Sequence, residues 1–149
     1  MSELTELYQE VIIDHGRRPR NFREMPDGTM AEGYNPLCGD HFTVWVKVAD
    51  DVITDVSFQG SGCAISTSSA SLMTETLKGM TRKDAEDLFS RVHAEMTGQP
   101  DPLPDGPELG KLEVFAGVQN FPMRVKCATL AWHTVKAALR NEQEPVSTE

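Results

Sequence analysis

The chain has 149 residues, 39% of them hydrophobic and 25% charged, which predicts a single soluble globular domain with its own core. Its formal net charge of −9 argues against nucleic acid as a partner, because phosphate binding needs a basic surface. No stretch approaches the roughly eighteen apolar residues of a membrane span, so no membrane partner is expected. The acidic start is unlike a signal peptide, and free cysteines suit a reducing compartment, so we expect a cytoplasmic protein.

The first half of the chain predicts one helix followed by a sheet. Apolar residues recur at helical spacing at Leu4, Leu7, Tyr8, Val11 and Ile12. Ser2 is the candidate N-cap of this helix, and Gly16 and Pro19 end it. Residues 29–60 alternate apolar and polar side chains and are rich in β-branched and aromatic residues. We expect three antiparallel strands there, near residues 30–34, 41–48 and 52–58.

The second half predicts mainly helices. One follows Gly62 and ends at Gly79, and its many Ser and Thr side chains are weak helix formers that must depend on tertiary packing. The other expected elements are a helix from Arg82 to about Thr97 capped by Thr81, a proline-rich loop over 98–108, a short helix over 108–118, and a last helix from Pro122 to about Arg140. Residues 142–149 are polar, and we expect a disordered tail.

The three cysteines lie far apart in the sequence, each among small residues, and an odd number cannot all form disulfides. Cys38 lies in a turn between strands, where Gly39 can adopt a positive φ and let Cys38 and Asp40 point to one place. Cys63 starts a helix, whose free N–H groups and dipole stabilise a thiolate. Cys127 lies on a small-residue face of the last helix, which allows another segment to approach closely.

Three thiols and the Asp40 carboxylate supply four donors. That is a tetrahedral set for zinc, or most of a ligand set for an iron–sulfur cluster. The spacing is too long for a zinc finger. Buried, inert cysteines remain the alternative at each position, because free cysteine is among the most buried residue types.

Other polar residues are expected to play smaller roles. His133 is about 120° from Cys127 around the helix and is interpreted as a surface residue. His41 should point away from its neighbour along the strand, where it could at most support the site. His15 and His93 are interpreted as ordinary helix residues. The basic cluster at Arg17, Arg18, Arg20 and Arg23 is interpreted as a solvated turn, with a docking patch for an acidic protein as the alternative.

Four motifs carry a specific resemblance over residues 7–139. They are Asp14-His15 with Pro19-Arg20-Asn21, Asn35-Pro36-x-Cys38-Gly39-Asp40, Gly60-x-Gly62-Cys63-Ala64-Ile65-Ser66, and Phe121-Pro122-x-Arg124-Val125-Lys126-Cys127-Ala128-x-Leu130-Ala131-Trp132. The chain resembles the U-type iron–sulfur cluster assembly proteins, the NifU/IscU N-terminal-like family, and within them the SufU branch. IscU-like members have a histidine before the third cysteine, where this chain has Lys126. The region 98–118 is similar to a SufU-type insertion, and the Leu-Pro-Pro-Val-Lys motif of IscU is absent.

The resemblance implies a fold, a metal and a reaction. The fold would be a single α+β domain over residues 1–149, with a three-stranded antiparallel sheet packed against about five helices. Zinc would be held by Cys38, Asp40, Cys63 and Cys127. The protein would accept persulfide sulfur from a SufS-type, pyridoxal-phosphate-dependent cysteine desulfurase and serve the downstream iron–sulfur assembly machinery.

In this family a desulfurase histidine replaces the first cysteine on zinc, which would free Cys38 as the nucleophile. Arg124 and Lys126 would then orient or neutralise the anionic site, with ordinary surface charge as the alternative for both. Two other functions stay open at this point. One is a scaffold on which a transient [2Fe–2S] cluster is assembled, and the other is a structural zinc protein without sulfur chemistry.

Overall fold

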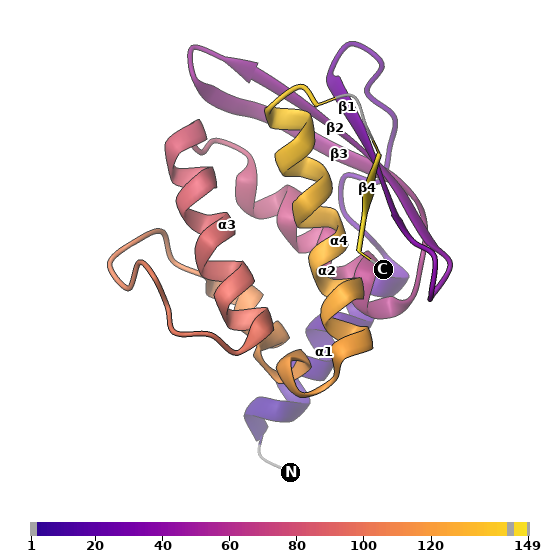
Figure 1. Cartoon of the computed structure of the whole chain (residues 1–149), viewed down its shortest axis with the longest axis vertical. Coiled ribbons are helices and arrows are strands. Elements are labelled where there is room, and N and C mark those ends of the chain that lie inside the picture. The colour runs from indigo at the N-terminus through magenta and orange to yellow at the C-terminus, as the bar shows by residue number, and fades with distance from the viewer. Residues whose placement is uncertain (1–2, 143–144, 149) are drawn as a thin grey trace.

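The computed structural model describes residues 3–142 and 145–148, so the expected N-cap Ser2 lies outside the described residues (Figure 1). Its elements in chain order are α1 (Glu3–Arg17), β1 (Thr29–Asn35), β2 (Asp40–Ala49), β3 (Val52–Ser61), α2 (Ala64–Leu77), α3 (Arg82–Thr97), the 3-10 helix η1 (Gly110–Asn120), α4 (Pro122–Leu139) and β4 (Val146–Ser147). The three central strands and the helices follow the sequence prediction closely. The short helix expected over 108–118 is the 3-10 helix η1, two residues further along the chain.

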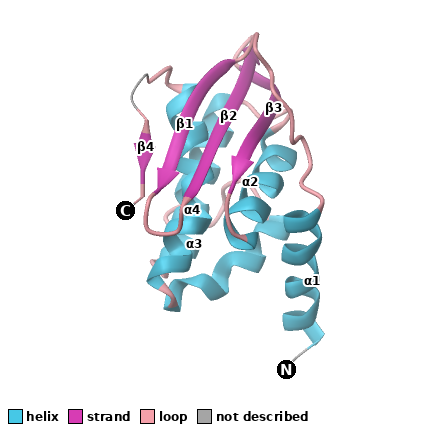
Figure 2. Ribbon diagram, turned by 90° about the vertical axis from the view of Figure 1, so that its right-hand side faces the viewer, coloured by secondary structure: helices cyan, strands magenta, loops and turns pink. Residues whose placement is uncertain are grey.

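The sheet has four strands in the order β3-β2-β1-β4, and it is mixed (Figure 2). β1, β2 and β3 are antiparallel neighbours, whereas β4 pairs in parallel with β1. The expectation of a three-stranded, purely antiparallel sheet was therefore wrong. The fourth strand lies in the tail expected to be disordered, where Val146 pairs with Gly33 and the Thr148 amide donates to the Tyr34 carbonyl at 3.1 Å. An exposed edge of β1 offers such hydrogen bonds to any nearby segment, whatever its composition.

The helices lie on one side of the sheet, as the antiparallel pairing of β1, β2 and β3 with one solvated face allows (Figure 2). The inward-facing side chains of β2 and β3 form the core with α2 and α4, and Phe42, Val44, Ile53, Val56 and Phe58 are fully buried. β1 approaches α4 most closely at Gly33, since a Cβ there would collide with the Oγ1 of Thr134. The absence of a side chain at Gly33 thus sets the spacing between β1 and α4.

The Ser-rich helix α2 has nine of its fourteen residues buried, four of them serines, which agrees with the prediction that it depends on packing rather than on helix propensity. The Ser69 hydroxyl donates to the Ala128 carbonyl at 2.6 Å and accepts from the Trp132 indole N–H at 3.1 Å, so it joins α2 to α4. Each hydroxyl that bonds a neighbouring element removes the desolvation cost of its own burial.

His15 is not an ordinary helix residue, because it is 2% exposed and joins α1 to α2. The Ser71 hydroxyl accepts from the Arg20 amide at 2.8 Å and shares a hydrogen bond with His15 Nδ1, 2.7 Å away. Burial lowers the pKa of His15, and the nearby Arg20 lowers it further. Both effects favour the neutral ring, which is compatible with the hydrogen bond to Ser71.

The proline-rich loop after α3 is held by one arginine. The Arg91 guanidinium binds the Asp101 carboxylate at 2.7 Å and donates to the Pro107 carbonyl at 2.6 Å. The ends of this loop are thus fixed on α3, from which the loop projects in Figure 1. Beyond the loop, η1 packs against α3 and brings Glu113 near the half-buried Glu95.

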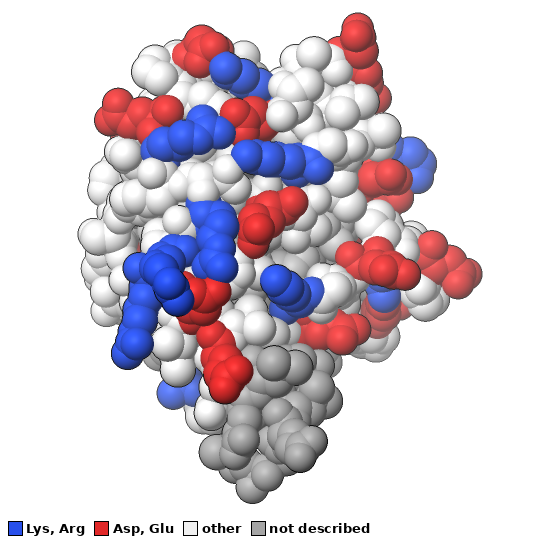
Figure 3. Space-filling model, turned by 180° about the vertical axis from the view of Figure 1, so that it is seen from behind, with Lys and Arg blue, Asp and Glu red and all other residues white. Residues whose placement is uncertain are grey.

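The basic cluster after α1 is largely paired within the molecule. Arg18 and Arg20 both bind Asp14, and Arg23 and Lys78 both bind Asp55. Figure 3 shows one face of the molecule, on which basic side chains are interspersed with acidic ones. This arrangement agrees with a solvated turn. Within the described part of the chain, no helix has both the length and the apolar character to cross a bilayer.

We predict that Gly33→Ala lowers the free energy of unfolding by about 1–3 kcal/mol, because the new methyl group overpacks the contact between β1 and α4. Thr134→Ala removes the atom that the methyl group would meet, so the double variant should recover about half or more of the loss. Urea unfolding measures all three variants. Gly117→Ala is the control, since a methyl group at this position of η1 would meet no neighbouring atom within 4 Å. Additive effects of Gly33→Ala and Thr134→Ala in the double variant would contradict the prediction.

We further predict that Glu95 makes the fold less stable as pH rises. Burial, reinforced by Glu113, raises the pKa of Glu95 from 4.5 to about 7. Between these values the folded protein holds a proton that the unfolded chain has released, so stability falls with rising pH and then levels off. Glu95→Gln should match the parent near pH 4 and exceed it at pH 8 in urea unfolding. Glu86→Gln on the same helix is the control, and equal pH profiles for Glu95→Gln and the parent would refute the prediction.

Candidate metal centre

The turn between β1 and β2 places Cys38 at the surface and Asp40 inside. The Cys38 amide donates to the Asn35 carbonyl at 3.2 Å, and Gly39 has the positive φ (73°) that the sequence predicted. Asn35 and Asp40 face each other across the strand pair that closes the turn. Cys38 is exposed, whereas Asp40 is 2% exposed at the first position of β2.

Asp40 also holds the start of α2. Its Oδ1 accepts the Cys63 amide at 3.1 Å, and Cys63 is the N-cap residue of the helix. The approach requires Gly62, because a Cβ there would lie 2.8 Å from Asp40 Oδ1 and 2.9 Å from the Phe42 ring. One carboxylate oxygen therefore fixes the segment that carries the second cysteine.

Cys127 reaches the same place from the second turn of α4. Its side chain is buried, and its Sγ lies 3.5 Å from Cys38 Sγ. The Asn35 side-chain amide points at Cys127 Sγ from 3.6 Å. Burial raises the pKa of the Cys127 thiol, as do the Asp40 carboxylate and the neighbouring Cys38 and Cys63. Without a cation, this thiol holds its proton at neutral pH.

Cys38, Asp40 and Cys127 form a group whose donor atoms all lie within 4.8 Å of one another. Two thiolates on tetrahedral zinc are about 3.8 Å apart, given Zn–S bonds of about 2.3 Å, so the sulfur separation of 3.5 Å suits such an ion. The second oxygen of Asp40, Oδ2, is buried without a hydrogen-bond partner. A buried carboxylate oxygen beside two thiols fits a cation, because burying a charge without a partner is costly.

Cys63, the fourth predicted ligand, lies beside this group but is not one of its members among the described residues. Its Sγ accepts the Ser66 amide at 3.5 Å as the helix cap. Its amide donates to Asp40 Oδ1 at 3.1 Å, which places Cys63 next to the group. The structure therefore places three predicted ligands together and the fourth next to them, and the complete set of four remains a prediction.

The two predicted supporting residues are placed differently from each other. Arg124 is exposed and stacks on the Phe121 ring, with its guanidinium carbon 4.6 Å from the ring centroid. Lys126 is half-buried, and its carbonyl accepts the Thr148 hydroxyl at 3.2 Å. Their suggested action on an anionic site remains a prediction.

No role was predicted for Asn35, although it is the first residue of the Asn35-Pro36-x-Cys38-Gly39-Asp40 motif. Its side chain is fully buried, and its Oδ1 has no hydrogen-bond partner among the described atoms. The two-residue period of a strand could have identified it, because a strand that turns Ala31 and Gly33 inward also turns Asn35 inward. A polar residue at the last inward position points to a polar interior at that end of the sheet.

The histidines do not join the centre. His41 is exposed and stacks on Tyr34 with ring centroids 4.3 Å apart, on the face of the sheet away from Asp40. His133 is half-buried rather than a plain surface residue, and it packs against His93 with ring centroids 5.8 Å apart. The expectation that neither is a ligand agrees with these positions.

The model of the NifU-like N-terminal domain family matches residues 7–128 of the chain. The chain belongs to this family. It is 39% identical over 143 residues to the iron–sulfur cluster assembly scaffold protein IscU of Streptococcus pyogenes serotype M1, covering 94% of this chain and 87% of that protein. It is 38% identical over 144 residues to the zinc-dependent sulfurtransferase SufU of Bacillus subtilis, covering 95% of both.

A solved structure gives the same result for the fold. The SUF-system protein FiSufU of Fervidobacterium islandicum AW-1 superposes with a TM-score of 0.81 at 34% identity, covering 93% of this chain and 99% of that one. The α+β fold of the family, in a single domain, is therefore shown. Family relatives carry both scaffold and sulfurtransferase names, so the family alone does not choose between these functions.

We predict that the three thiols of the metal-free, reduced protein differ in reactivity. Cys38 and Cys63 are exposed, so they should react rapidly with a disulfide reagent such as 5,5′-dithiobis(2-nitrobenzoate). Cys127 is buried with a raised pKa and should react about tenfold or more slowly.

Single Cys→Ser variants assign each kinetic phase of the reaction to one thiol, since Cys127→Ser should remove only the slow phase. One stoichiometric zinc ion should slow all three thiols if all are ligands. Rapid reaction of Cys63 in the presence of zinc would contradict its place in the ligand set, and equal rates for all three thiols without zinc would contradict the burial argument.

Proposed function

We propose that the chain is a zinc-dependent sulfur acceptor that takes persulfide sulfur from a SufS-type cysteine desulfurase for iron–sulfur cluster assembly. The observation that carries the proposal is the buried Asp40 carboxylate, with one oxygen unpartnered beside the thiols of Cys38 and Cys127. The similarity to SufU of B. subtilis, whose name states zinc dependence, supports it.

The proposed zinc ligands are Cys38, Asp40, Cys63 and Cys127. Bound zinc lowers the pKa of coordinated thiols and so supplies thiolates at neutral pH. The hydrogen bonds around the ligands already position them in the metal-free protein. Asp40 fixes the amide of Cys63, and the Asn35 amide can stabilise negative charge on Cys127 sulfur.

Cys38 is the proposed sulfur acceptor because, of the two exposed cysteine ligands, it is the one on a turn, whereas Cys63 caps helix α2 and its sulfur accepts the Ser66 amide. Its thiolate attacks the outer sulfur of the donor persulfide. The new bond joins Cys38 Sγ to that sulfur, the sulfur–sulfur bond of the donor breaks, and the electron pair leaves on the donor cysteine as a thiolate. The persulfide passes between two thiols without net oxidation, so no further reactant is needed.

The surroundings of Cys38 suit a protein donor. Leu37, Phe121 and Met123 are large apolar side chains exposed by 58%, 49% and 46%, and each is close in sequence to Cys38 or Cys127. Exposed apolar groups near a reactive thiol favour protein docking over a purely small-molecule reaction. The partner proposed from the SufU similarity is a pyridoxal-phosphate-dependent desulfurase in the cytoplasm, with the iron–sulfur assembly machinery downstream.

The second candidate function is a scaffold that carries a transient [2Fe–2S] cluster. The S. pyogenes relative with the scaffold name is as similar to this chain as the SufU relative. Three thiols and Asp40 could also bind such a cluster. Lys126 argues against it, because an ammonium group cannot replace a histidine as a ligand while it remains protonated.

We predict that the purified protein holds one zinc ion per chain and stimulates the turnover of a SufS-type desulfurase. Cys38→Ala should lose about tenfold or more of the stimulation, and Asp40→Ala should lower the zinc affinity by about tenfold or more. Metal analysis, a chelator competition and the alanine-formation assay of the desulfurase measure these effects. Asp105→Asn, in the loop after α3, is the control and should change neither.

Each other outcome points to a different function. A stable iron–sulfur cluster after anaerobic purification, with no zinc, would favour the scaffold. Zinc without any effect on the desulfurase would indicate a structural site. Unchanged zinc affinity in Asp40→Ala would show that Asp40 is not a ligand.

A further inference from the structure

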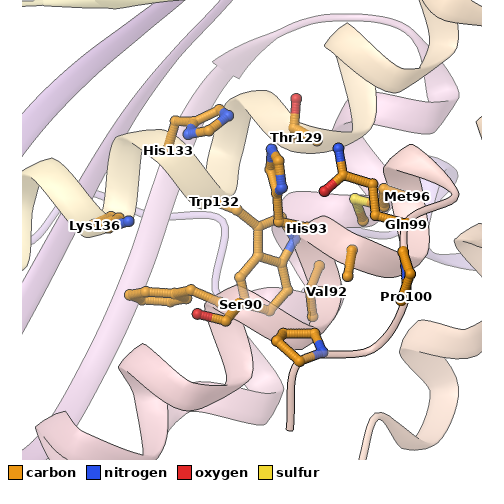
Figure 4. Close-up of a pocket in the computed structure, with 13 residues that line it drawn as sticks. Ser90, Val92, His93, Met96, Gln99, Pro100, Thr129, Trp132, His133 and Lys136 are labelled. Atoms are coloured by element: carbon orange, nitrogen blue, oxygen red, sulfur yellow. The ribbon is translucent and has the colours of Figure 1, made fainter.

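A second site lies between α3, α4 and the start of the proline-rich loop. It is a pocket of about 360 Å³, within the range that small-molecule sites occupy (Figure 4). Its apolar lining includes Phe89, Val92, Met96 and Trp132, and Pro100 and Pro102 close it from the loop. The indole of Trp132 packs edge-on against Phe89, with ring centroids 5.8 Å apart. These walls suit a flat or branched apolar body.

Three nitrogen-bearing side chains of the pocket carry or can carry positive charge, and its other polar side chains, Ser90, Gln99 and Thr129, are neutral. His93 comes from α3, and His133 and Lys136 come from α4. Figure 4 shows both histidine rings near the Trp132 indole, with the Gln99 amide across from them. Among the described residues that line the pocket, none is an aspartate or a glutamate. This is notable in a chain with a net charge of −9.

The electrostatic effect of this arrangement is visible at His133. Burial lowers the pKa of His133, and His93 and Lys136 lower it further. The loop residues that face it from the third side, Gln99, Pro100 and Pro102, carry no charge. The ring therefore lies among like charges without a carboxylate partner, and an anion within the pocket would relieve that repulsion.

We propose that this pocket binds a small organic carboxylate with an aromatic or branched apolar body. The carboxylate lies among His93, His133 and Lys136, and the apolar body lies against Trp132. A divalent metal ion is a poorer occupant, because the Lys136 ammonium repels it and no carboxylate is present to share its charge.

The site is separate from the thiol centre and goes beyond the proposed sulfur transfer. Thr129, Trp132, His133 and Lys136 line the pocket from one side of α4. At 100° per residue, Cys127 is separated around the helix by about 160° from Thr129, about 120° from His133 and about 180° from Lys136, so it faces away from the pocket. Loss of ligand binding at the pocket would therefore leave zinc binding intact.

The test uses naphthalene-2-carboxylate, with the neutral naphthalene-2-carboxamide as the matched probe. NMR titration of the zinc-loaded protein should show the carboxylate binding about tenfold more tightly than the carboxamide, the value of one charge-assisted hydrogen bond. The indole signal of Trp132 should shift, while that of Trp45, on strand β2, should not. Bound carboxylate should also raise the pKa of His133 in a histidine titration.

Two variants identify the charged partners. Lys136→Met keeps the apolar length of the side chain, and His133→Gln keeps a polar group; each should reduce the preference for the carboxylate by about threefold or more. Lys83→Met is the control, because Lys83 pairs with Asp87 on α3 and does not line the pocket.

Equal affinity for the two probes would refute the proposal that the ligand is an anion. An unchanged Trp132 indole signal at millimolar probe would refute the proposal that this pocket is a binding site. Nickel(II) that binds at His93 and His133 in preference to the carboxylate would instead assign a metal site. None of these three results affects the zinc and desulfurase measurements, so the two proposals can fail independently.

Discussion

The buried Asp40 carboxylate is the constraint on which the rest of the site depends. One of its oxygens is satisfied by the Cys63 amide, and the other has no partner beside the thiols of Cys38 and Cys127. The effective desolvation penalty of a buried ion is several kcal/mol, and a fold keeps such a group only where something offsets it. The proposed cation would offset the penalty here, and it would also favour loss of the proton that burial holds on Cys127.

The elements around Asp40 are arranged so that three distant segments meet at one point. The turn after β1 carries Cys38, the start of α2 carries Cys63, and the second turn of α4 carries Cys127. Close contacts at two glycines make this meeting possible. Gly33 lets β1 approach α4, and Gly62 lets the start of α2 approach Asp40. The Ser69 hydroxyl then joins α2 to α4, so the two helices that carry thiols are fixed to each other as well as to the sheet.

Helix α4 separates two chemically different environments. On one side the thiols and Asp40 form an acidic centre that attracts a cation. On the other side His93, His133 and Lys136 line a pocket suited to an anion. Because α4 is mostly buried from Cys127 to Leu139, both environments depend on the same packed helix. The loop held by Arg91 completes only the second of them, which gives the proline-rich segment a structural role apart from the thiols.

Local patterns in the sequence were enough to predict the helices, the three central strands, the turn at Gly39 and the cap at Thr81, because each depends on neighbours within a few residues. The sequence alone also supplied the four candidate ligands, since their chemistry is visible as residue types. Only the tertiary structure decided which of them meet, and it placed Cys38, Asp40 and Cys127 together with Cys63 alongside. β4, the burial of His15, the Asn35 contact with Cys127 and the pocket at Trp132 were likewise decided by tertiary contacts. Each of these joins segments remote in sequence, and no local periodicity encodes such a contact.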